Sequence, residues 1–196
     1  MLNTVTVDVA EWISTGSFSG VVVGMNKGQV HSIVGDPLGW ADSSKVDEVG
    51  DFLDANIWGY GIWTFFFDDG VLDAVTANFA MLEEVGFYFG VSGVEFSAND
   101  EVDDILGKLA VRGIKVFELP REYWVREPSR VEISRKKRVR AERTFLVGSE
   151  LLGRIMFERE SEKLSQMAYP FSPVFQAIGR SAMQRRPGYV VDSDQS

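Results

Sequence analysis

Apolar residues recur at the spacing of an amphipathic helix within residues 24–37. They form one stripe, which we expect to face a core: Val30, Ile33 and Val34. Asn26 has the side chain of an N-cap, and Gln29, three residues later, completes a capping box. Because Gly35 favours the left-handed conformation that ends helices, the pattern predicts a short helix that begins after Asn26.

A second helical pattern covers residues 99–112. Its apolar positions follow the i, i+3, i+4, i+7 and i+8 spacing: Val102, Ile105, Leu106, Leu109 and Ala110. Acidic residues crowd its first turns, and Lys108 and Arg112 lie near its end, as the helix dipole favours. A last helix is expected to begin at Ser172-Pro173 and to run to about Met183.

Alternating apolar residues around turns predict two β-hairpins. The first joins residues 59–67 to residues 71–79 through Asp68-Asp69-Gly70, a sequence typical of a tight turn. The second joins residues 153–157 to residues 164–169 across a longer polar stretch. Further strands are expected at residues 87–89, 93–96, 114–119, 131–134 and 144–147.

The order helix, connector, hairpin therefore occurs twice along the chain. This order predicts an α+β fold of tandem helix-plus-antiparallel-sheet units, one acidic unit at residues 1–96 and one at residues 97–196. The second unit would carry a basic hairpin and the last helix. Because the connectors are short, we expect the two units to share an interface.

Residues 57–69 are interpreted as one extended strand with two unlike faces. One face carries three large aromatic side chains and is expected to be buried: Trp63, Phe65 and Phe67. The other face carries Trp58 and Tyr60. These two rings form either an exposed platform that anchors a partner or a layer packed under the neighbouring acidic segment.

That acidic segment, residues 41–55, contains the largest concentration of candidate binding residues. Its carboxylates are Asp42, Asp47, Glu48, Asp51 and Asp54. Apolar residues between them permit a short amphipathic helix, whose charged face would be either merely solvated or a recognition surface. With Trp40, Trp58 and Tyr60 as anchors, the segment is the predicted partner-binding surface.

Charge is divided unequally along the 196 residues. Residues 1–118 hold 19 acidic and 5 basic side chains, a net of −14, and residues 119–196 hold 10 acidic and 15 basic, a net of +5. The acidic half repels nucleic acid and attracts a basic partner. The basic stretch at residues 135–143 is expected at a solvated hairpin tip, with a phosphate or acidic-partner contact as the alternative.

Composition and motifs remove many kinds of catalytic site. The chain has no cysteine, and its single histidine, His31, leaves no site that needs two imidazoles. Asp68, Asp69 and Asp73 flank a turn and lack calcium-loop spacing, so no metal or other cofactor is expected. No phosphate-binding glycine loop, membrane span or secretory signal is evident, which predicts a cytoplasmic protein without catalytic activity.

The residues Gly24-Met25-Asn26-Lys27, Val30 and Ile33-Val34-Gly35-Asp36-Pro37 carry a resemblance to two bacterial groups. One has the β-lactamase-inhibitor-protein-like fold of tandem helix-and-sheet repeats; the other is the small lipoprotein of the outer-membrane assembly machinery, which would need an export signal and a lipidated cysteine. In outline the chain is similar to immunity proteins of bacterial polymorphic toxin systems. This resemblance implies a fold and carries over no contact residue.

These observations favour an immunity or inhibitor protein that binds and occludes a cognate, basic toxin or enzyme. An intracellular adaptor or chaperone-like module is the alternative, and a hydrolase with a spatially assembled carboxylate pair is a third. The sequence leaves the oligomeric state open.

Overall fold

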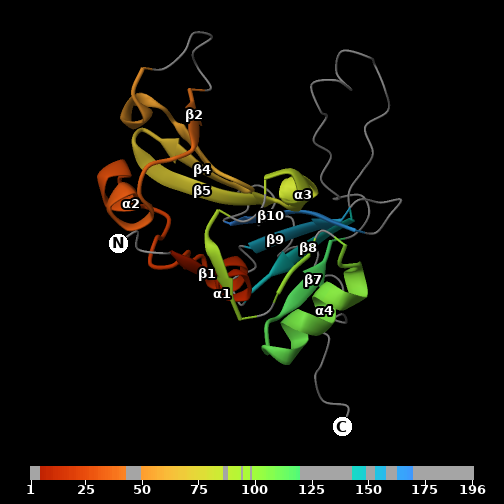
Figure 1. Cartoon of the computed structure of the whole chain (residues 1–196). Coiled ribbons are helices and arrows are strands. Elements are labelled where there is room, and N and C mark those ends of the chain that lie inside the picture. The colour runs from red at the N-terminus through yellow and green to blue at the C-terminus, as the bar shows by residue number, and fades with distance from the viewer. Residues whose placement is uncertain are drawn as a thin grey trace.

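A computed structural model describes residues 5–42, 50–85, 88–93, 95–97, 99–119, 143–148, 153–157 and 163–169 (Figure 1). The helices are α1 (Val9–Thr15), α2 (Lys27–Val34), α3 (Leu82–Val85) and α4 (Val102–Val111), with 3₁₀ turns η1 (Phe52–Asp54) and η2 (Phe79–Met81). The strands are β1 (Thr6–Asp8), β2 (Gly39–Ala41), β3 (Ile57–Tyr60), β4 (Trp63–Asp68), β5 (Val71–Asn78), β6 (Gly90–Ser92), β7 (Val116–Glu118), β8 (Arg143–Val147), β9 (Gly153–Phe157) and β10 (Leu164–Tyr169).

An eight-stranded antiparallel sheet organises the molecule. Its order is β2-β3-β4-β5-β10-β9-β8-β7, while β1 and β6 form a separate parallel pair. Four strands of this sheet (β2–β5) follow α2 and four (β7–β10) follow α4, and β5 pairs with β10 between the two sets. The fold is therefore α+β, as predicted. The predicted boundary at residues 96–97 falls between β6 and α4, and both sets of strands belong to one sheet.

The first predicted helix is confirmed together with its capping box. The Gln29 amide donates to Asn26 Oδ1 at 2.9 Å, and the Asn26 amide donates to Gln29 Oε1 at 2.9 Å. Gly35 ends the helix with a φ of +77°. Local hydrogen bonding alone sets both ends of α2, which explains why the sequence was sufficient to find them.

The second predicted helix begins later than expected. α4 starts at Val102 behind the cap residue Glu101, whereas the prediction placed the start near Asn99. Asp100 is used elsewhere, because its carboxylate accepts hydrogen bonds from the Ser97 amide at 2.8 Å and from Lys108 Nζ at 2.6 Å. Asp100, which was expected in the first turn of the helix, therefore belongs to the loop that leads into it.

Both predicted hairpins are present, but residues 57–69 are not one strand. They form a further hairpin, in which β3 turns into β4 at Gly61, with a φ of +63°, and Ile62. Tyr60 lies opposite Trp63, and Trp58 lies opposite Phe65. Residues opposite each other in antiparallel strands point to the same face, so the two sets of aromatic rings share one face of the sheet.

Two other expectations differ from the described residues. The short helix permitted within residues 41–55 is not seen where that segment is described, since Ala41 ends β2 and residues 50–55 contain only the 3₁₀ turn η1; residues 43–49 lie outside the described residues. Two strands were expected at residues 87–89 and 93–96, but the described residues of those ranges form no strand; a single strand, β6 at Gly90–Ser92, lies between them and pairs with β1. The expected strand at 131–134, residues 135–142 of the basic stretch 135–143 and the last helix at 172–183 lie outside the described residues, and Arg143 begins β8.

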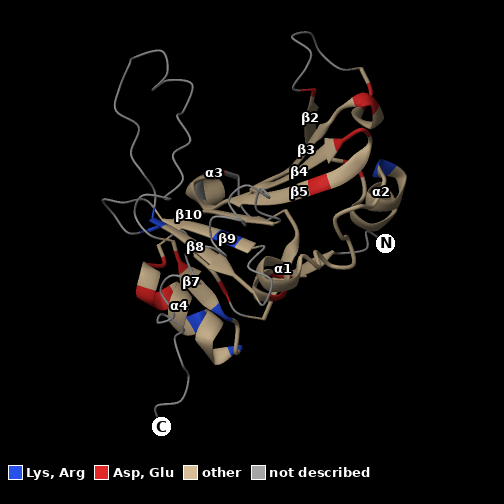
Figure 2. Cartoon of the chain, turned by 180° about the vertical axis from the view of Figure 1, so that it is seen from behind, with Lys and Arg blue, Asp and Glu red and all other residues tan. Residues whose placement is uncertain are grey.

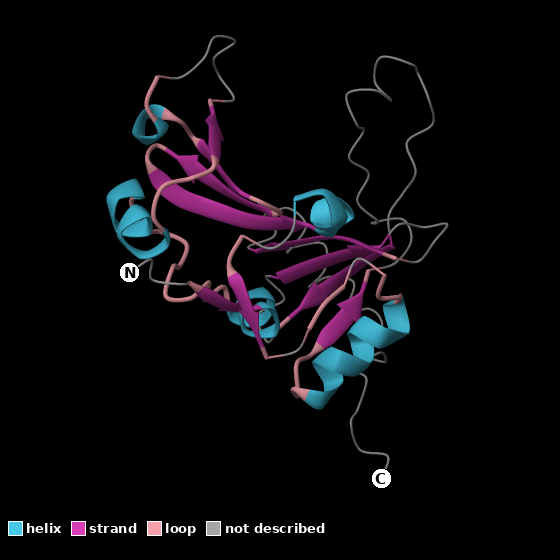
Figure 3. Ribbon diagram, viewed as in Figure 1, coloured by secondary structure: helices cyan, strands magenta, loops and turns pink. Residues whose placement is uncertain are grey.

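One apolar core joins the helices to the sheet. Trp63, Phe65 and Phe67 are buried in it, as predicted. Helices α1, α2 and α4 contribute Trp12, Val30 and Ile105 to the same core, and all three lie on one side of the sheet (Figure 3). Strands from both halves reach this core, so the halves are packed as one body.

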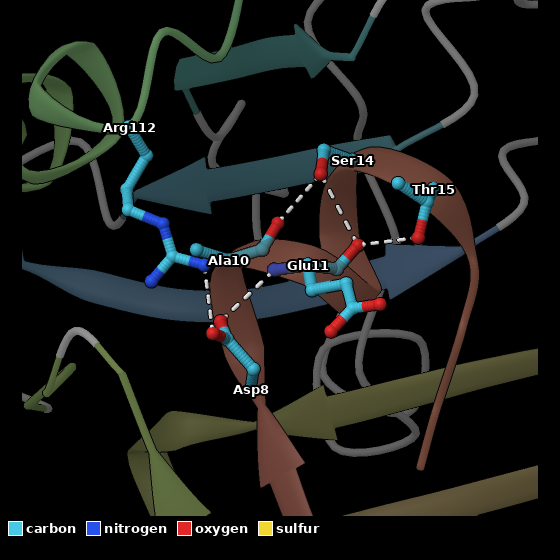
Figure 4. Close-up of polar contacts among 6 residues, drawn as sticks. All are labelled: Asp8, Ala10, Glu11, Ser14, Thr15 and Arg112. Carbon is cyan, nitrogen blue, oxygen red and sulfur yellow. Dashed lines mark hydrogen bonds and ion pairs between the residues drawn. The ribbon is translucent and has the colours of Figure 1, made fainter. Parts of the chain in front are cut away.

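An ion pair links α1 to the end of α4 (Figure 4). Asp8 caps α1 by accepting the Glu11 amide at 3.1 Å, and Arg112 Nη2 donates to Asp8 Oδ2 at 2.7 Å. Burial opposes ionisation of Asp8, but the hydrogen bonds from Arg112 and Glu11 prevail and lower the pKa of the carboxyl group.

Candidate partner-binding surface

Trp58 and Tyr60 do not form the exposed platform that one interpretation of the sequence expected. Both side chains are fully buried. The physical reason is the β3–β4 turn, which places Trp58 and Tyr60 on the same face as Phe65 and Trp63 instead of the opposite face. The alternative interpretation is correct for Trp58, whose side chain packs beneath the neighbouring acidic segment.

Each of the two rings is also fixed by a hydrogen bond. The Trp58 indole N–H donates to the Phe52 carbonyl oxygen at 2.7 Å, and the Tyr60 hydroxyl donates to the Gly35 carbonyl oxygen at 2.9 Å. Burial, with smaller contributions from Tyr88 and Asp36, raises the pKa of Tyr60 above its ordinary value. These residues support the surface above them and do not themselves contact a partner.

Trp40 is the predicted anchor that remains accessible. Trp40 is 42% exposed, and two exposed leucines occur in the same region: Leu38, two residues before Trp40, is 64% exposed, and Leu53, in the turn η1 that contacts β2, is 47% exposed. The Trp40 ring lies 6.1 Å from the Phe52 ring, which packs in turn on Trp58. We call Leu38, Trp40 and Leu53 the Trp40 surface; it stands at the β2 end of the sheet on a buried aromatic support.

Carboxylates border the Trp40 surface. Asp36, Asp51 and Asp54 are exposed or nearly so, and Asp42, which follows β2, is half-buried. Asp47 and Glu48 lie outside the described residues. Figure 2 shows acidic segments around η1 and at the nearby β4–β5 turn. Lys27 is the only lysine or arginine among the described residues up to 85. This end of the sheet is therefore acidic.

Helix α2 holds η1 in place beneath the Trp40 surface. Lys27 Nζ donates to the Leu53 carbonyl oxygen at 2.7 Å, and the His31 ring lies 5.2 Å from the Phe52 ring. His31 Nε2 is 2.6 Å from Asp36 Oδ1. Asp51 caps the turn by accepting the Leu53 amide at 2.9 Å. The carboxylates and the apolar side chains are thus presented by a braced turn.

The described residues contain no group of three or more histidine, cysteine, aspartate or glutamate side chains placed to hold a metal ion. Within the same residues, no helix has the length and apolarity needed to cross a membrane.

Leu38 and Leu53 of this surface, and Asp36 at its border, were not among the predicted binding residues. Leu38 and Leu53 are apolar residues that stand out only once the edge of the sheet is known, and Asp36 entered only through the motif that carries the resemblance. The sequence Gly59-Tyr60-Gly61 was the available signal for the overlooked turn, because glycine at a positive φ suits a two-residue hairpin.

Comparisons of the chain with protein-family models, with curated proteins and with solved structures give no match in any of the three. The likeness to immunity proteins therefore stays a prediction from the sequence.

Proposed function

We propose that this chain is a non-catalytic binding protein of the bacterial cytoplasm that occludes a basic protein partner, as an immunity protein does with its cognate toxin. The observation that carries the proposal is the Trp40 surface bordered by Asp36, Asp42, Asp51 and Asp54. Exposed aromatic and aliphatic side chains provide desolvated anchors, and the surrounding charges favour a partner of opposite sign.

The two parts of the surface have different kinetic roles. Carboxylates act at a distance, so they raise the rate at which a basic partner arrives. Trp40, Leu38 and Leu53 act only after contact, so they set how long the complex lasts. Occlusion needs no further chemistry, because a bound protein that covers an active site blocks it.

The first test uses the protein encoded by the gene next to this one. Its binding to the full chain is followed by surface kinetics at 0.1 M and 1 M salt, and its own activity is assayed with and without the chain. Asp42, Asp51 and Asp54 are changed together to Asn, which keeps an oxygen to cap η1 at Asp51. The matched control changes three other exposed acids, Asp73 and Asp103 to Asn and Glu84 to Gln.

We expect the variant with Asp42, Asp51 and Asp54 changed to Asn to associate with the partner more slowly at low salt than the control variant does. The difference should shrink at 1 M salt, where the Debye length falls from about 10 Å to about 3 Å. Equal association rates for the two variants would contradict the steering role. Binding without loss of the partner's activity would favour the adaptor alternative over an inhibitor.

A further inference from the structure

We propose that Asp69, in the turn between β4 and β5, is a site of spontaneous covalent modification. Its side chain condenses with the backbone amide of Gly70, and hydrolysis of the product leaves isoaspartate in the chain. The modification goes beyond the proposed function, because it needs no partner. Its structural consequence concerns α2, because the turn is hydrogen-bonded to the start of that helix.

The β4–β5 turn contains the one Asp-Gly pair of the chain, which has no Asn-Gly pair. Asp69 and Gly70 are the two central residues of the hairpin, since Asp68 and Val71 on either side pair with each other. Both central residues have a left-handed backbone, with φ of +47° at Asp69 and +77° at Gly70. Asp69 therefore occupies a conformation that residues with a side chain rarely adopt.

Three features leave the reacting atoms accessible. Asp69 is exposed. Among the described residues, no hydrogen bond engages the Asp69 carboxylate or the Gly70 amide. Gly70 has no Cβ, so nothing on the attacking residue obstructs the approach of its nitrogen. Ring closure also needs a rotation about the Asp69 Cα–C bond, which a short exposed turn permits when it opens locally. Asp68 is exposed too, but the residue after it carries a side chain.

The reaction balances with water as its only other participant. The Gly70 nitrogen forms a bond to Asp69 Cγ, the Cγ–OH bond breaks, and the amide proton leaves with the hydroxyl group as water. A second water molecule then opens the resulting five-membered succinimide ring. Attack at Cγ restores aspartate, whereas attack at the main-chain carbonyl carbon leaves isoaspartate, in which the chain runs through Cβ and Cγ of residue 69.

Isoaspartate adds a methylene group to the main chain of the turn and thereby disturbs its contact with α2. The Lys27 amide donates to the Gly70 carbonyl oxygen at 3.1 Å, and the Leu72 amide donates to the Met25 carbonyl oxygen at 2.7 Å. The length of a hairpin turn fixes the positions of the residues that it joins. The added group should displace the Gly70 carbonyl oxygen and leave the Lys27 amide less protected from hydrogen exchange.

The test incubates the full chain in mildly acidic buffer and follows isoaspartate at each aspartate by electron-transfer fragmentation of its peptides. Methyl transfer by an isoaspartate-specific methyltransferase gives an independent measure. Asp69→Ser removes the carboxyl group, and serine tolerates a positive φ in this chain at Ser19, where φ is +51°. Asp69→Asn forms the same ring with loss of ammonia and should react faster. Asp68→Ser is the matched control, because it removes an exposed carboxylate beside the site.

We expect isoaspartate to accumulate at residue 69 before any other described aspartate. It should be lost in Asp69→Ser, form faster in Asp69→Asn and persist in Asp68→Ser. Hydrogen exchange at the Lys27 amide should quicken as the isoaspartate fraction rises. A parent protein that gains no isoaspartate at residue 69, or that is methylated no more than Asp69→Ser, would overturn the site. Isoaspartate without faster exchange at Lys27 would overturn its link to α2.

Discussion

At the residue scale, one glycine decides which aromatic side chains are available to a partner. Gly61 reverses the chain between Tyr60 and Trp63, and these two residues then face each other across the hairpin. Alternation along an unbroken strand would have placed them on opposite faces. The sequence therefore predicted correctly that Trp63 is buried. It did not decide whether Trp58 and Tyr60 are exposed or buried, because the face on which a residue lies beyond a turn depends on where the turn is.

Adjacent phenylalanines on β4 provide a test of the two sheet faces. Phe65 is fully buried in the aromatic core, whereas its neighbour Phe66 points to the other face and is only half-buried. Phe65→Ala should lower the free energy of unfolding by about 3–5 kcal/mol through lost burial and a residual cavity. Phe66→Ala should cost clearly less. Urea denaturation of both variants measures the difference, and equal losses would contradict the assignment of the faces.

At the element scale, structure that depends on local hydrogen bonds was predictable and structure that depends on distant partners was not. The capping box of α2 involves two residues three positions apart. By contrast, β6 exists because β1 lies beside it, although the two strands are more than eighty residues apart in the chain. Likewise β2 has only three residues, too few for a pattern, and depends on β3.

The Asn26 cap supplies a prediction about α2. Asn26→Ala removes the oxygen that accepts the Gln29 amide and should lower the free energy of unfolding by about 1 kcal/mol. Asn26→Ser, which keeps an acceptor, should recover most of that loss. An Ala variant as stable as the parent protein in urea denaturation would show that the cap is unimportant.

The contact between α1 and α4 predicts a pH dependence. Because the folded state lowers the pKa of Asp8, the stabilisation is fully present above the carboxyl group's unfolded pKa of about 3.9 and is lost as the pH falls through the folded value. The free energy of unfolding should therefore differ between the parent and Asp8→Asn near pH 6, and the difference should shrink below about pH 4. Asp73→Asn is the control at an exposed carboxyl group. A difference that is independent of pH would contradict the ion pair.

At the scale of the whole molecule, the shared sheet makes the two halves one unit. β5 and β10 pair across the middle, and the core contains Val75 from one side and Met167 from the other. We therefore expect tryptophan fluorescence, which reports mainly on the first half, and far-ultraviolet circular dichroism to give the same unfolding midpoint in urea. Two separate transitions would show that the halves unfold independently.

The whole-molecule charge pattern also shows why the binding surface was only partly predictable. The acidic character of the first half could be read from the sequence, but the exposure of Trp40 depends on its place at the end of the sheet. The predicted surface therefore keeps Trp40, Asp42, Asp51 and Asp54, and the structure replaces Trp58 and Tyr60 with Leu38, Leu53 and Asp36.

The most direct test of the account is the dissociation rate of the complex between this chain and the neighbouring gene product. Trp40→Ala should raise that rate by roughly thirtyfold or more, equivalent to about 2 kcal/mol, with little change in association. Val111→Ala shortens an apolar side chain on α4 that is 87% exposed and should leave the rate unchanged. Equal dissociation rates for the Trp40→Ala, Val111→Ala and parent complexes would contradict the claim that the Trp40 surface binds the partner.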